Sequence, residues 1–101
     1  MYRGTTPTLL LELDTTVSLA NLAELWATFR TAAVEVTKTL SEVTIDDELK
    51  IITVPLTQEE TLKLYNANCQ VQVRFRTQEG KAYASTISDI CVENILKDGE
   101  I

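Results

Sequence analysis

The sequence predicts an all-β fold: an antiparallel β-sandwich of immunoglobulin type with about seven strands. The chain holds 15 threonines, eight valines and seven isoleucines, so 30 of its 101 residues are β-branched and favour strands over helices. Several short segments alternate apolar and polar residues, and turn-forming residues separate them. With 45% hydrophobic and 24% charged residues, residues 1–101 are expected to form one globular domain. A small open barrel is the alternative.

The first third of the chain is predicted to hold two strands. The first begins after Pro7, and its buried face is marked by leucines at alternate positions, Leu9, Leu11 and Leu13. The second runs to about Thr31, and its buried face carries Leu25, Ala27 and Phe29. Between these strands, residues 18–22 are expected to form a helical turn.

The middle of the chain is predicted to hold three strands and a helix. Residues 34–39 form a strand close enough to the second strand for a hairpin, and residues 43–45 form a short strand. The acidic residues 46–48 make a polar turn before a strand over residues 49–54, which Pro55 ends. Thr57 and Glu60 have the spacing of a capping box, which predicts a short helix to about Leu64.

The last third contains the clearest strand, residues 69–76, in which odd positions are apolar and even positions are polar. Gly80 can take the positive φ of a tight turn over residues 77–81, so residues 82–88 are expected to pair antiparallel with this strand. Residues 90–96 are either a last strand or a kinked continuation. We expect the inward side chains of the clearest strand to be buried against those of the first two strands: Val71, Val73 and Phe75 against Leu9, Leu11, Leu25 and Phe29.

Composition argues against several classes of function. The net charge of −6 disfavours nonspecific nucleic-acid binding, and the absence of histidine removes the commonest general base and metal ligand. Asp46, Asp47 and Glu48 are consecutive, so in an extended chain they point to alternating sides and do not converge on one substrate bond. The sequence therefore predicts no catalytic residue, no metal site and no cofactor.

The two cysteines and the distribution of charge bear on the compartment. Cys69 and Cys91 lie 22 positions apart without a CxxC motif, and we expect both to be reduced; a disulfide between adjacent strands is the alternative. The longest stretch without a charge, residues 64–73, is too short to cross a bilayer, and Glu12 and Asp14 interrupt any signal-peptide core. The chain is therefore expected to be made in the cytoplasm.

One surface is a candidate for binding. Trp26 alternates with the buried residues of its strand and should point outward, where a loop or another chain covers it. Arg74 and Arg76 also point outward, as solvated polar side chains or as contacts to a partner. If the two strands are neighbours, a single face carries three of the nine basic residues and the only tryptophan. The predicted protein-binding residues are Trp26, Thr28, Arg30, Gln72, Arg74 and Arg76.

Four segments resemble a family of small proteins encoded among the structural genes of temperate phages and prophages of Gram-positive gut bacteria. They are YRGTTPTL at residues 2–9, LTQEETLKL at 56–64, VQVRFRTQEG at 71–80 with Ala84 and Ser85, and ILKDG at 95–99. The arrangement also looks like the N-terminal module of the phage baseplate upper protein, a β-sandwich that attaches receptor-binding parts to the tail.

The resemblance implies a non-enzymatic virion component of the tail or baseplate. Its partners are then other virion proteins, including further copies of itself, and it moves from the host cytoplasm into the virion. The alternative is a carbohydrate-binding or adhesin-like sandwich module, which needs an exposed aromatic platform that only Trp26 or Tyr83 could supply from a strand. A small cytosolic enzyme or regulator is a third class, disfavoured by the missing histidine.

Overall fold

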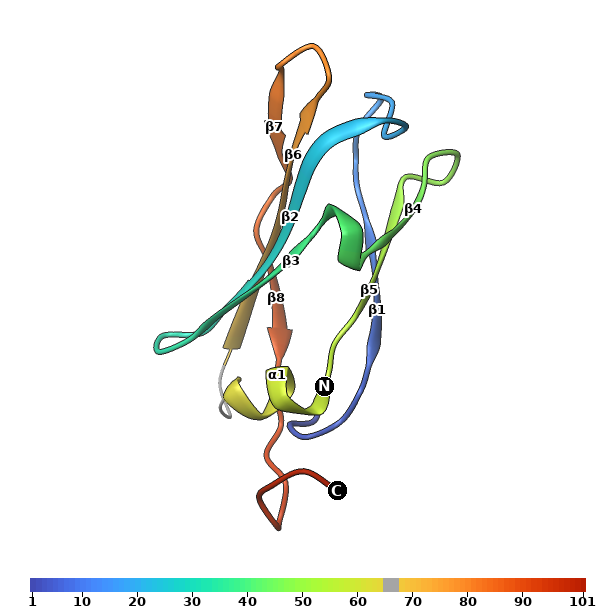
Figure 1. The fold of residues 1–101 in the computed structure, drawn as a ribbon. Helices are drawn as coiled ribbons and strands as arrows, with labels where there is room; N and C mark the ends of the chain where they lie inside the picture. The colour runs from blue at the N-terminus through green and yellow to red at the C-terminus, as the bar shows by residue number, and fades with distance from the viewer. Residues whose placement is uncertain (65–67) are drawn as a thin grey trace.

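The computed structural model describes residues 1–64 and 68–101, in which eight strands form two antiparallel sheets packed face to face (Figure 1). The larger sheet has the order β3-β2-β6-β7, and β8 also pairs with β6. The smaller sheet has the order β1-β5-β4. The predicted all-β sandwich is therefore confirmed, and a short α-helix precedes the β6–β7 hairpin as expected.

The elements follow the sequence pattern closely. The larger sheet contains β2 (Leu22–Arg30), β3 (Glu35–Thr39), β6 (Asn68–Thr77), β7 (Ala82–Ala84) and β8 (Ser88–Cys91). The smaller sheet contains β1 (Thr8–Glu12), β4 (Thr44–Asp46) and β5 (Ile51–Pro55). A 3-10 helix, η1 (Leu40–Glu42), leads from β3 to β4, and α1 (Gln58–Lys63) follows β5. Pro55 is the last residue of β5 rather than the residue after it.

The core lies between the sheets and holds the predicted residues. Leu25, Ala27 and Phe29 of β2 are fully buried, and the inward residues of β6 are at most 5% exposed: Val71, Val73 and Phe75. On the smaller sheet, Leu9 and Leu11 of β1 are half-buried and pack against this core. The alternation of apolar and polar residues in the sequence therefore predicted the inward face of each of these strands correctly.

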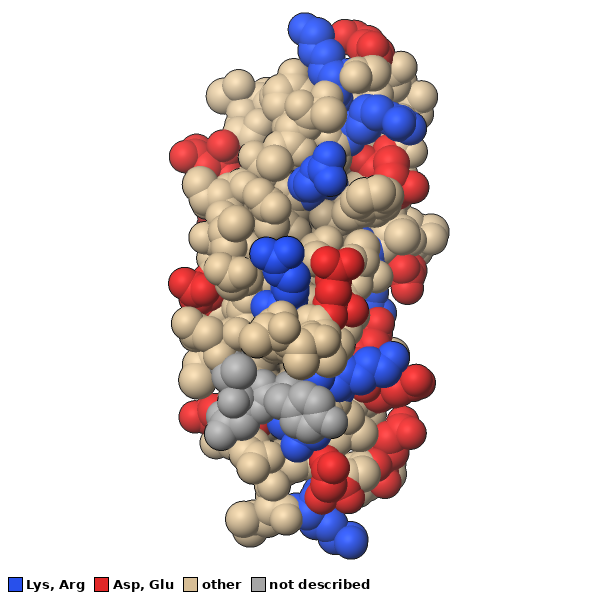
Figure 2. Space-filling model, turned by 90° about the vertical axis from the view of Figure 1, so that its left-hand side faces the viewer, with Lys and Arg blue, Asp and Glu red and all other residues tan. Residues whose placement is uncertain are grey.

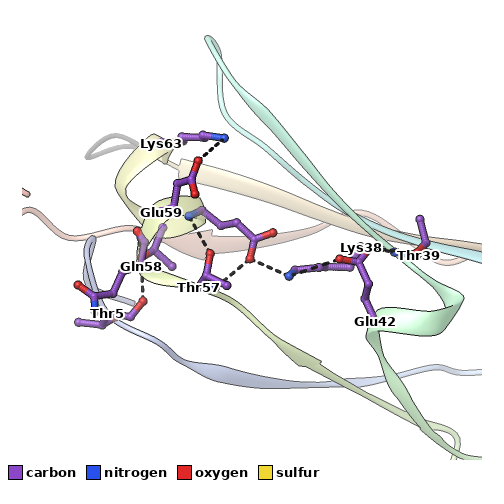
Figure 3. Close-up of polar contacts among 10 residues, drawn as sticks. Thr5, Lys38, Thr39, Glu42, Thr57, Gln58, Glu59 and Lys63 are labelled. Atoms are coloured by element: carbon purple, nitrogen blue, oxygen red, sulfur yellow. Dashed lines mark hydrogen bonds and ion pairs between the residues drawn. The ribbon is translucent and has the colours of Figure 1, made fainter. Parts of the chain in front are cut away.

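Polar contacts hold the helix α1 at one end of the sandwich. The Thr57 hydroxyl accepts a hydrogen bond from the Glu60 amide at 3.2 Å, and the Glu60 carboxylate accepts one from the Thr57 amide at 2.9 Å, so the predicted capping box is confirmed (Figure 3). The same Glu60 carboxylate lies 2.7 Å from Nζ of Lys38, which is buried on the inward side of β3. This ion pair ties the edge of the larger sheet to the helix.

The N-terminal segment joins the smaller sheet to the segment that follows β8 of the larger sheet. The backbone of residues 1–3 runs beside residues 91–93: the Glu93 amide donates to the Met1 carbonyl at 2.7 Å, and the Arg3 amide donates to the Glu93 carbonyl at 3.0 Å. The buried Arg3 guanidinium also donates to the Leu62 carbonyl at 2.8 Å and lies 3.3 Å from the Asp98 carboxylate. These contacts connect the N-terminal segment, α1 and the C-terminal segment.

Three local predictions need correction. Residues 18–22 do not form a helical turn: the Leu19 amide donates to the Asp47 carboxylate at 2.6 Å, and Asn21 takes a left-handed conformation (φ 56°) that turns the chain into β2. Residues 82–88 are not one strand either, because the ladder to β6 is interrupted between Ala84 and Ser88. The last pairing, β8, resumes on β6 and ends at Cys91, so the kinked continuation is the alternative that the structure supports, over a shorter range than residues 90–96.

The cysteines lie on neighbouring strands without a disulfide between them. Cys91 is paired in register with Asn68, one residue before Cys69, so the two thiol side chains point to opposite faces of the sheet. Cys69 is buried and Cys91 is exposed. The register excludes the alternative of a disulfide between adjacent strands.

Candidate functional site

The structure places the six predicted binding residues on one surface. β2 and β6 are neighbours, and Trp26 stands directly opposite Arg74, with Thr28 opposite Gln72. All six side chains lie on the outward side of the larger sheet, where the three arginines are exposed and Trp26 is 46% exposed. We call this surface the tryptophan face; it consists of Trp26, Thr28, Arg30, Gln72, Arg74 and Arg76.

Trp26 and Arg74 contact each other at the centre of the tryptophan face. The Arg74 guanidinium carbon lies 5.7 Å from the centroid of the Trp26 ring, within the distance of a cation–π interaction. At an exposed site such a contact contributes about 0.5–1 kcal/mol. The contact therefore orients both side chains while the ring remains accessible from other directions.

The strand β3 adds polar side chains that the sequence analysis did not include. Thr37 and Glu35 are exposed beside Thr28 and Arg30, and the hydroxyls of Thr28 and Thr37 lie 3.3 Å apart. The signal was present in the sequence, since residues 35, 37 and 39 alternate with buried positions in the predicted strand 34–39. The predicted hairpin between residues 34–39 and the second strand already placed β3 beside β2, so these side chains could have been added to the candidate surface from the sequence.

A β-bulge adds an apolar side chain to the same surface. The Ser85 amide donates to the Val73 carbonyl at 2.8 Å, whereas Ser88 pairs with Val71, so one extra residue is accommodated opposite β6. The Ser85 hydroxyl accepts from the Val73 amide at 3.0 Å and fills the interrupted ladder. Ile87 is left 54% exposed beside the tryptophan face. No short-range pattern in the sequence indicated this bulge.

These strands enclose an open concavity of about 600 Å³ on the outward side of the larger sheet. Its lining includes Trp26, Arg30, Thr37, Gln72, Arg74 and Ile87. Glu35 is the one carboxylate in the lining, and the chain has no histidine, so the concavity does not offer the pair of carboxylates that glycoside hydrolysis uses. The lining is suited to binding through stacking, hydrogen bonds and arginine contacts.

Positive charge on this side of the molecule is concentrated along the middle of the sheet. Figure 2 shows basic side chains along the middle of this surface and most acidic side chains toward its margins. Arg30 is paired in register with Glu35, and the Glu24 carboxylate, opposite Arg76, accepts from the Leu25 amide at 2.9 Å. The positive surplus therefore centres on Arg74.

Two of the three consecutive carboxylates of residues 46–48, Asp46 and Asp47, have structural roles. Asp47 accepts from the Leu19 amide and lies 2.7 Å from Nζ of Lys50; the Lys50 ammonium and the Leu19 amide hold the pKa of Asp47 below its usual range. The Asp46 carboxylate accepts from the Leu49 amide at 3.1 Å and closes the turn between β4 and β5. The predicted polar turn is therefore present. Its Asp47 carboxylate also holds the loop before β2 through the hydrogen bond from the Leu19 amide.

Metal-binding groups, reactive thiols and membrane-spanning helices are further features that could indicate a function. Within residues 1–64 and 68–101, no group of three or more His, Cys, Asp or Glu side chains is placed to hold a metal ion. Burial raises the pKa of the Cys69 thiol, which disfavours the reactive thiolate. None of the helices in these ranges is long and apolar enough to span a membrane.

Comparison with known proteins gives no relative: no protein family, no curated protein and no solved structure matches this chain.

Proposed function

We propose that this chain is a non-enzymatic structural component of a phage or prophage virion, in the tail or baseplate, that binds other virion proteins through the tryptophan face. The observation that supports a binding role is the Trp26–Arg74 pair, exposed at the centre of a sheet surface. Tryptophan and arginine are, with tyrosine, the side chains enriched among residues that dominate protein interfaces. The resemblance of four sequence segments to phage structural proteins supports the placement in a virion.

The geometry favours a protein partner over a sugar. A carbohydrate-binding module needs a free aromatic platform, and Trp26 already has the Arg74 guanidinium over its ring. Tyr83 is half-buried and stacks on Phe75 with ring centroids 5.3 Å apart, so it belongs to the margin of the core. A protein partner can instead use the concavity, the exposed Ile87 and the arginines together.

Incorporation into particles tests this function. In a lysogen that carries the gene, the double variant Trp26→Ser with Arg74→Glu is expected to reduce the amount of this protein in purified particles at least about tenfold, since interface hot spots of this type contribute about 2 kcal/mol or more. Quantitative mass spectrometry of the particles measures the amount. Circular dichroism and thermal melting of the purified variant check that the sandwich is intact.

The control is Lys81→Glu, which reverses a charge at the exposed tip of the β6–β7 hairpin and leaves the tryptophan face unchanged. The control should enter particles like the wild type. Wild-type protein missing from the particles, or a double variant incorporated as efficiently as the wild type, would refute the proposed function.

A further inference from the structure

We infer that the tryptophan face binds the outer surface of the smaller sheet of a second copy, so that copies of this chain stack head to tail. The inference rests on the proposed binding role of the tryptophan face and names its partner. The second surface of this contact lies on the side of the sandwich that faces away from the tryptophan face.

The strands of the smaller sheet direct alternate residues to solvent. Inward positions such as Ile52 and Val54 are fully buried, so the residues between them point outward. The register aligns Leu10 with Thr53 and Thr44 across the three strands, and Glu12 with Ile51 and Asp46. We call this surface the acidic face; it consists of Thr8, Leu10, Glu12, Thr44, Asp46, Ile51, Thr53 and Pro55.

The charges of the two faces are complementary. The acidic face has two carboxylates, Glu12 and Asp46, and none of its eight residues is basic. The tryptophan face has three arginines, of which Arg74 has no acidic residue opposite it in the sheet. Two tryptophan faces brought together would juxtapose arginines, and two acidic faces would juxtapose carboxylates. Unlike faces therefore attract, whereas like faces repel.

The exposed apolar side chains are distributed in the same complementary way. Leu10 is 66% exposed on the acidic face, and Pro55 is exposed on the same surface. Trp26 and Ile87 are 46% and 54% exposed on and beside the tryptophan face. Stacking would cover both sets from water, which is the main favourable term in most protein association.

The size of the molecule is sufficient for such an interface. The principal extents are 47, 24 and 20 Å, so the outline of one broad side measures on the order of 1,000 Å² and sets the upper limit of the contact, whereas each partner buries roughly 800 Å² in a standard interface. Because the interface joins two different surfaces of the same chain, it leaves one free face of each kind at the ends of every stack. Such an interface builds rings or open stacks rather than closed two-fold dimers.

Sedimentation velocity of purified protein tests the inference. The wild type should self-associate, and the apparent dissociation constant should rise as salt increases. Arg74→Glu on one face and Glu12→Lys on the other should each raise that constant at least about tenfold. Glu12 is the better target because the Asp46 carboxylate closes a turn. The matched controls are Lys81→Glu and Glu79→Lys at the tip of the β6–β7 hairpin, which should associate like the wild type.

Mixing the two variants distinguishes head-to-tail stacking from contacts between like faces. The Arg74→Glu chain keeps its acidic face and the Glu12→Lys chain keeps its tryptophan face, so an equimolar mixture should associate at concentrations at which neither variant does so alone. A Glu12→Lys variant that associates like the wild type would overturn the inference. A wild type that remains monomeric to about 1 mM would overturn it as well, because the interface would then contribute less than about 4 kcal/mol.

The proposed function in the virion and the proposed head-to-tail stack can be refuted independently of each other. If the wild type is monomeric but the double variant Trp26→Ser with Arg74→Glu is lost from particles, the tryptophan face binds a different virion protein and the head-to-tail stack is wrong. If the chains stack in solution but the double variant is incorporated normally, the stack stands and the role of the tryptophan face in the virion is wrong.

Discussion

The inner and outer surfaces of the β2–β6 pair share one backbone register and have opposite characters. On the inner surface the register pairs Leu25 with Phe75, and the neighbouring pairs are equally apolar and buried. On the outer surface it pairs Trp26 with Arg74, and the neighbouring pairs are polar. The comparison teaches that folding and binding depend on alternate residues of the same strands, so the binding surface can be changed without disturbing the core.

The largest effect should come from the inner surface. Replacing Phe75 with alanine removes a ring that is 5% exposed and stacked on Tyr83, and should reduce the free energy of unfolding by about 3–5 kcal/mol. Urea denaturation followed by tryptophan fluorescence measures this. A cost below 1 kcal/mol would mean that the inner and outer sides of β6 have been assigned wrongly.

A smaller effect should come from Lys38, a buried cation on the inward side of the neighbouring strand β3. Replacing Lys38 with alanine leaves the half-buried Glu60 carboxylate without its ammonium partner, and should cost about 2 kcal/mol, less than a fully buried pair because Glu60 is partly solvated. The matched control is Lys63→Ala, since the Lys63–Glu59 pair is exposed and should contribute less than about 0.5 kcal/mol. Equal costs for the two variants would contradict the special role of Lys38.

The same contact should make stability depend on pH. Partial burial pushes the pKa of Glu60 upward, but the Lys38 ammonium and the amide and hydroxyl of Thr57 outweigh it and hold that pKa below its usual range. A carboxylate whose pKa is lower in the folded state stabilises the fold above about pH 4.3, the ordinary value for glutamate, and this stability is lost as the pH falls through the folded-state pKa. Melting temperatures from pH 7 to pH 3 should therefore fall less steeply in Glu60→Gln than in the wild type. Parallel curves would show that the titration of Glu60 does not contribute.

The smallest effect on stability should come from the outer surface. Replacing Arg74 with alanine should change the free energy of unfolding by less than about 1 kcal/mol, because the guanidinium is exposed and only its contact with the Trp26 ring is lost. The same urea experiment checks this value. A cost similar to that of Phe75→Ala would abolish the distinction between the two surfaces.

Much of this architecture was predictable because it depends on neighbouring residues. The alternation of residues 69–76 gave the two sides of β6, and the spacing of Thr57 and Glu60 gave the helix start. The features that escaped prediction depend on contacts between distant residues. The turn before β2 is fixed by Asp47, 28 residues beyond Leu19, and the buried position of Lys38 is made acceptable by Glu60 on another element.

The candidate site also combines features that were predictable from neighbouring residues with features that depend on the arrangement of the strands. Each outward residue of the tryptophan face followed from its own strand, whereas their assembly into one surface required β2 to lie beside β6. Ile87 joined that surface through a bulge whose geometry depends on the register of β6 with two separate strands. Local periodicity therefore assigns the direction of a side chain, and only the topology assigns its neighbours.

The pairing of residues 1–3 with residues 91–93 has a consequence for biosynthesis. Residues 1–3 are translated some ninety residues before their hydrogen-bonding partners. The hydrogen bonds between the two segments therefore cannot form while the region around Glu93 is still inside the exit tunnel of the ribosome. Contacts between such distant positions also slow folding, since a large loop must close before they form.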